Sequence, residues 1–125
     1  MKISKTKSLP LLFLALISAI SCQTAKAPQV ADATYESFST NQEKGYLVNF
    51  TLSDDNMWPK AVVLNKIQHE IQPGEKNGLN YSVRMLAESR ALMGFRPQIS
   101  DRNNGILFKK DSTEIYKEVE FKLKD

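Results

Sequence analysis

The chain has 125 residues with 17 basic and 14 acidic side chains, and its three excess positive charges are Lys2, Lys5 and Lys7, near the N-terminus. The rest of the chain balances 14 basic against 14 acidic side chains, which excludes the basic stripe that nucleic-acid binding requires. With one cysteine, Cys22, and one histidine, His69, the sequence also predicts no disulfide, no metal site and no cofactor.

Residues 1–21 have the pattern of a signal peptide. The three lysines precede an uncharged, apolar run at residues 9–20, and small residues follow it. In a helix this run would reach about 18 Å, which is too short for the roughly 30 Å of a bilayer core. A positive start, a short apolar run and small residues at the end are typical of an export signal that is removed.

The segment Ala19-Ile20-Ser21-Cys22 resembles the lipobox of Gram-negative bacterial lipoproteins. The resemblance covers about the first fifth of the chain, and no family is recognised for the remainder. It implies that Cys22 carries the lipid, including palmitate, and becomes the first mature residue. Gln23 after the cysteine implies anchoring in the outer membrane, on its periplasmic side or at the cell surface.

Residues 22–33 are predicted to form the lipidated cysteine and a tether, because they are small, polar and without apolar periodicity. Cleavage after Ala25-Lys26-Ala27 is an alternative, although it would leave Pro28 as the first mature residue. Alternating patterns begin at Thr34, so residues 34–125 are predicted to form a single domain.

Apolar and polar residues alternate through most of this domain, as they do in half-buried strands. The turn-rich run Asp101–Gly105 favours a hairpin between the strands on either side of it. The predicted strands are Tyr46–Leu52, Ala61–Leu64, Ile67–Ile71, Leu79–Ala87, Phe95–Ile99, Ile106–Lys109 and Glu114–Leu123.

Short strands separated by turns predict an all-β fold, an antiparallel β-sandwich of the immunoglobulin-like kind. The alternative is an α+β domain with a helix around residues 82–93, because Met85–Met93 is rich in helix formers and Gly94 follows it. The last strand has two readings as well. A regular register turns Lys117 inward, whereas a bulge there would place Tyr116 in the core.

His69 is the first candidate for chemistry, as a general base or metal ligand. It shares a strand face with Ile67 and Ile71, so we expect it to be half-buried with its ring nitrogens hydrogen-bonded. No spacing links it to a serine and an aspartate as a catalytic triad requires. The sequence therefore predicts a non-enzymatic protein, and a hydrolase is the least favoured function.

Trp58, with Met57 beside it and Phe95 in another connection, is the candidate binding face. The favoured interpretation is instead that Trp58 folds back to close one end of the core. Together these observations predict a membrane-anchored, extracytoplasmic lipoprotein that acts as an accessory or assembly subunit through contact with a protein partner. The alternative is a carbohydrate- or cell-wall-binding module that uses Trp58.

Overall fold

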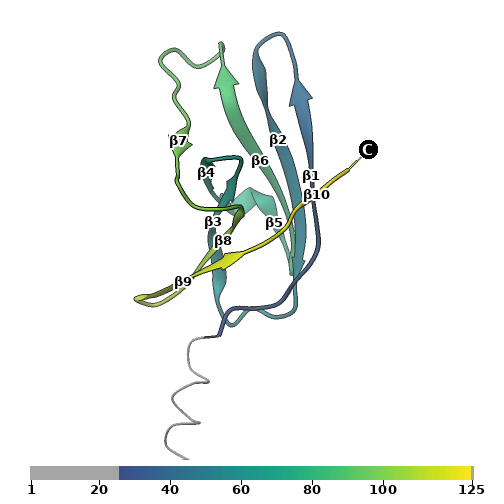
Figure 1. The fold of residues 1–125 in the computed structure, drawn as a ribbon, viewed down its shortest axis with the longest axis vertical. Coiled ribbons are helices and arrows are strands. Elements are labelled where there is room, and N and C mark those ends of the chain that lie inside the picture. The colour runs from purple at the N-terminus through teal and green to yellow at the C-terminus, as the bar shows by residue number, and fades with distance from the viewer. Residues whose placement is uncertain (1–25, 125) are drawn as a thin grey trace, which may run out of the picture.

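The computed structural model describes residues 26–124, which form two five-stranded sheets packed against each other (Figure 1). In the first sheet the spatial order is β10-β1-β2-β6-β5, and in the second it is β7-β4-β3-β8-β9. The strands of the first sheet are β1 (Val30–Ser39), β2 (Glu43–Leu52), β5 (Lys76–Asn77), β6 (Asn80–Ser89) and β10 (Lys122–Leu123). Those of the second are β3 (Trp58–Leu64), β4 (Ile67–Glu70), β7 (Gln98–Ile99), β8 (Gly105–Lys110) and β9 (Thr113–Glu118).

The predicted antiparallel β-sandwich is confirmed. All neighbouring strands are antiparallel except β10, which runs parallel to β1. Strands β1, β2, β6 and β5 take the places of A, B, E and D in an immunoglobulin constant domain, and β3, β8 and β9 take those of C, F and G. The alternative helix at residues 82–93 is wrong, because β6 continues in strand conformation through Ser89.

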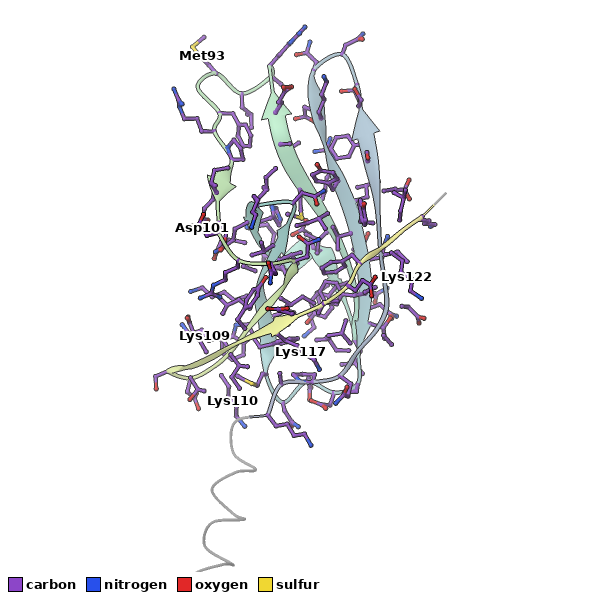
Figure 2. All side chains as sticks on the ribbon, in the orientation of Figure 1. Met93, Asp101, Lys109, Lys110, Lys117 and Lys122 are labelled. Carbon is purple, nitrogen blue, oxygen red and sulfur yellow. The ribbon has the colours of Figure 1, made fainter. Side chains whose placement is uncertain are left out.

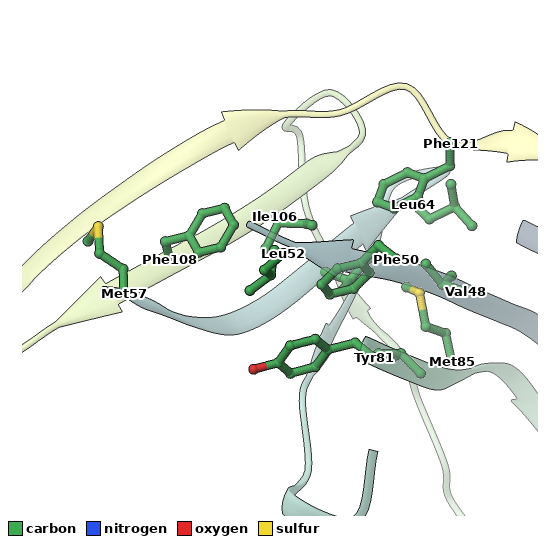
Figure 3. Close-up of a cluster of buried hydrophobic side chains, with 12 residues drawn as sticks. Val48, Phe50, Leu52, Met57, Leu64, Tyr81, Met85, Ile106, Phe108 and Phe121 are labelled. Atoms are coloured by element: carbon green, nitrogen blue, oxygen red, sulfur yellow. The ribbon is translucent and has the colours of Figure 1, made fainter. Parts of the chain in front are cut away.

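The core lies between the inner faces of the two sheets (Figure 3). Alternation along β2 and β6 buries one side chain in every two, so the period-two pattern of the sequence becomes the inner face of the first sheet. The Phe50 and Tyr81 rings stack with their centroids 5.0 Å apart. The buried cluster consists of Val48, Phe50, Leu52, Met57, Val62, Leu64, Tyr81, Val83, Met85, Ile106, Phe108 and Phe121.

Strand β3 lies in the middle of its sheet and is covered on both faces, as its continuous apolar run predicts. Ala61, Val62, Val63 and Leu64 all have 0% exposure. Only Val62 and Leu64 belong to the core cluster, so Ala61 and Val63 are buried on the outer face. Asn65 and Lys66, which separate β3 from β4, both have positive φ angles, and the two strands pair directly as a hairpin.

The predicted hairpin across Asp101–Gly105 is wrong. Strand β7 pairs with β4, and β8 pairs with β3 and β9, so the two flanking strands never meet. Hydrogen bonds hold the connecting segment on the β3–β4 turn instead. The Ser100 amide donates to the Lys66 carbonyl at 2.9 Å, and the Asn65 amide donates to Asn104 Oδ1 at 2.8 Å.

The predicted last strand, Glu114–Leu123, is two strands in different sheets. After β9 the chain crosses from the second sheet to the first, where β10 pairs with β1 (Figure 1). The register between β8 and β9 is continuous, so the bulge that would turn Tyr116 into the core is absent. Lys117 pairs with the core residue Ile106 and points inward, where its Nζ donates to the carbonyl of buried Pro28 at 2.9 Å.

The sandwich includes residues before Thr34. Strand β1 starts at Val30, and Pro28 is already fully buried, so residues 30–33 belong to the sheet rather than to a tether. The alternating signal is weak there because the β1–β2 register shifts between Ala31 and Thr34, and a shift of this kind breaks the period of two. The predicted signal peptide and Cys22 lie outside the described residues.

Candidate functional site

The structure separates the three residues of the predicted binding face. Met57 is 3% exposed and belongs to the core, whereas Trp58 is 49% exposed. Phe95 is half-buried and follows Met93, at the end of the sandwich opposite the Lys109–Lys110 turn (Figure 2). Because Trp58 pairs with Lys109 across β3 and β8, it lies far from Phe95 along the long axis. The three residues do not form one surface.

The prediction that Trp58 closes the end of the core is wrong, and Met57 occupies the core instead. Pro59 pairs with Phe108, whose side chain points into the core, so Trp58 beside it points outward. The register shifts between Pro59 and Ala61, and this bulge decides which neighbours face inward. Trp58 is therefore an exposed aromatic side chain on the outer face of the second sheet.

His69 is half-buried and paired, as the sequence predicts for a structural histidine. Its Nε2 lies 3.0 Å from Glu75 Oε1, in the 3₁₀ helix Pro73–Glu75. The same carboxylate accepts two backbone N–H groups, from Gln72 to Oε1 and from Arg84 to Oε2, both at 2.8 Å. Glu75 thus links β4 of one sheet to β6 of the other, along an open side of the sandwich.

The His69–Glu75 contact joins the two sheets, and among the described residues no hydroxyl nucleophile hydrogen-bonds His69. Both oxygens of Glu75 are held by backbone donors, and a carboxylate so held is fixed in place. Within residues 26–124, no three histidine, cysteine, aspartate or glutamate side chains gather as a metal site would require.

An open groove of about 840 Å³, which we call the crossover groove, lies where the chain crosses from β9 to β10. Its lining residues are Asn65, Lys66, Arg102, Asn103, Asn104, Glu118, Val119, Glu120 and Phe121. Several of these polar groups hold the loop before β8. Lys66 Nζ donates to the Asp101 carbonyl at 3.2 Å, and the Val119 amide donates to the Asn104 carbonyl at 3.0 Å.

Tyr116 borders this groove and fixes its loop as well. Its hydroxyl donates to the carbonyl of Asn103, and the Arg102 guanidinium lies 4.6 Å from its ring centroid. Burial raises the pKa of Tyr116 to about 12; the nearby Arg102 lowers it and Glu118 raises it. The hydroxyl is therefore a neutral hydrogen-bond donor at physiological pH, which suits a structural role.

The residues between β6 and β7 form an exposed apolar loop, which we call the 90–96 loop (Arg90–Arg96). Met93 is completely exposed, with a relative accessibility of 101%, and Leu92 is 52% exposed. Figure 2 shows Met93 at the extremity of the molecule, pointing away from both sheets. The binding face predicted from the sequence does not include Leu92 or Met93; the available signal was an apolar pair flanked by arginines after the strand alternation ends.

Comparison with known proteins gives no family model, no curated protein and no solved structure that matches this chain. Among residues 26–124, no helix is long and apolar enough to cross a membrane.

Proposed function

We propose that the protein is a lipid-anchored, extracytoplasmic accessory subunit that acts by contact with a protein partner. The observation that carries the contact is the 90–96 loop, which keeps Leu92 and Met93 in solvent at the end of a well-packed sandwich. Large apolar side chains displayed together in this way mark interaction sites more often than scattered surface residues do. The anchor is supported by the sequence of residues 1–22 alone.

The described side chains favour binding over catalysis. Both oxygens of Glu75 accept hydrogen bonds from backbone amides, and several lining residues of the crossover groove hold the loop before β8. Nucleophilic catalysis would need a hydroxyl or thiol beside His69, and in the part of the chain that the structure describes the ring of His69 hydrogen-bonds only Glu75.

Replacing Cys22 by serine tests the anchor. Because Cys22 is the only cysteine, a diacylglycerol attached to a cysteine sulfur must be attached there. We expect the wild-type protein to take up a metabolic palmitate label and to fractionate with the outer membrane. The Cys22→Ser protein should lose the label to background, and it should remain unprocessed in the inner membrane or be released.

A Ser8→Ala variant is the matched control, since it changes the leader without touching the cysteine and should behave as wild type. A Cys22→Ser protein that still fractionates with outer membranes would show that lipid is not the anchor.

A second candidate function, carbohydrate or cell-wall binding, is favoured by one observation. Trp58 is the only tryptophan and is half-exposed on the outer face of the second sheet, where its ring is available to stack on a sugar. Under this alternative, glycans or peptidoglycan fragments should quench and shift its fluorescence in a saturable titration. Emission that does not respond to any of these ligands would remove the alternative.

A further inference from the structure

The 90–96 loop is ordered by its own backbone hydrogen bonds although its apolar side chains face solvent. The Arg90 amide donates to the Gln42 carbonyl at 2.7 Å, which ties the loop to the β1–β2 turn. The Leu92 amide donates to Ser89 Oγ at 3.2 Å, and the Phe95 amide donates to the Leu92 carbonyl at 3.1 Å. The backbone on both sides of Met93 is thus held before any partner arrives, which lowers the backbone entropy lost on binding.

Positive charge surrounds this apolar tip. Arg90 and Arg96 flank it in sequence, and both are exposed. Lys44, Glu43 and Glu88 line the same hollow as Arg90, between the loop and the β1–β2 turn. The Glu43 carboxylate forms an ion pair with Arg84 at 2.6 Å, so the negative charge of Glu43 is compensated. The surface around Leu92 and Met93 therefore carries more positive than negative charge.

The shape and charge of this tip indicate what kind of partner it binds. A second copy of the chain in a two-fold contact would bring this net positive surface against an equally positive one, and the two would repel. The membrane holding an N-terminal anchor is also disfavoured, because the described chain begins at the end of the sandwich opposite Met93 (Figures 1 and 2). A projecting apolar tip instead fits a concave apolar pocket.

We infer that Leu92 and Met93 insert into an apolar pocket on a partner protein, and that acidic residues on the rim of that pocket pair with Arg90 and Arg96. This inference rests on the proposed function and names the surface and the chemistry of the partner. Leu92 and Met93 become buried in the complex and supply most of the affinity. Arg90 and Arg96 set the orientation of the partner and the rate of association.

A photo-crosslinking amino acid at Met93, in the full-length protein in its native membrane, tests the inference. We expect a discrete adduct with one protein, in which the linked peptide maps to an apolar pocket beside acidic residues. The same probe at Leu123, which is 61% exposed on β10, is the matched control and should not give this adduct.

Charge reversal tests the acidic rim. Changing Arg90→Glu and Arg96→Glu together should lower the yield of the Met93 adduct about tenfold or more, since like charges would then face each other. Reversing the exposed Lys110 and Lys122 to glutamate should leave the yield unchanged. All these residues are on the surface, so melting temperatures should stay near wild type.

Each other outcome overturns the inference. Adducts with lipid alone would make the loop a membrane contact, and adducts between two copies of the chain would make it a self-association surface. If the Arg90→Glu, Arg96→Glu protein gives the Met93 adduct in undiminished yield, the partner has no acidic rim that pairs with these arginines. Protein adducts from Trp58 but not from Met93 would overturn the inference and leave the proposed function standing, whereas no protein adduct from any exposed position would overturn both.

Discussion

Replacing Gly45 by alanine is expected to destabilise the domain by about 3 kcal/mol, near the upper end for overpacked sites. Gly45 is buried in β2, and a Cβ there would overlap the carbonyl oxygen of Met85 and lie 3.0 Å from its carbonyl carbon. These are backbone atoms of the paired strand β6, so no side-chain rotation can relieve the clash.

The close approach arises from a register shift between Lys44 and Gly45, where β2 pairs with Glu88 and then with Leu86. Such a bulge brings the backbone of β6 against the one residue of β2 that lacks a Cβ. In thermal unfolding followed by circular dichroism, the melting temperature should fall by about 15 °C, given about 4–8 °C per kcal/mol for a domain of this size.

Gly74→Ala is the matched control for Gly45→Ala. Its Cβ would meet nothing within 4 Å, and its φ is not positive, so the change should be neutral or stabilise by up to about 1 kcal/mol. Equal melting temperatures for the two variants would show that the β2–β6 bulge yields easily.

Local alternation predicted the centre of the fold correctly. The inner face of β2 carries Val48, Phe50 and Leu52, and that of β6 carries Tyr81, Val83 and Met85, as a period of two requires. The pairing of distant segments could not be read in this way. Strand β7 pairs with β4 and is only two residues long, which is too short for its own residues to specify a partner. The pairing depends on where the loop between β6 and β7 packs.

The candidate site was predicted less well for a related reason. Met57 and Trp58 are neighbours, and the sequence gives no sign of which faces inward. The bulge between Pro59 and Ala61 decides this; Pro59 signals an irregularity in the strand but not which neighbour the bulge turns inward. His69 was placed correctly as half-buried, because it shares the face of Ile67 and Ile71; its partner Glu75 comes from a separate 3₁₀ helix.

Phe121→Ala is the second large effect, with an expected loss of about 3–5 kcal/mol. Phe121 lies in the crossover between β9 and β10, is 6% exposed and packs in the core cluster (Figure 3). Phe121 lies outside both strands, so no strand pairing holds it in place. The burial of its ring therefore keeps the crossover packed against the sandwich. Removing the ring would leave a cavity and release the pairing of Thr34 and Tyr35 with β10.

Urea unfolding should therefore show a lower midpoint for Phe121→Ala, with protection from hydrogen exchange lost first in β10. Leu123→Ala, two residues further on and 61% exposed, is the matched control and should change stability by about 0.5 kcal/mol or less. If the two variants unfold at the same urea concentration, Phe121 does not hold the crossover. The attachment of the C-terminal segment would then rest on backbone contacts such as the Lys124 amide to the Tyr35 carbonyl, at 2.8 Å.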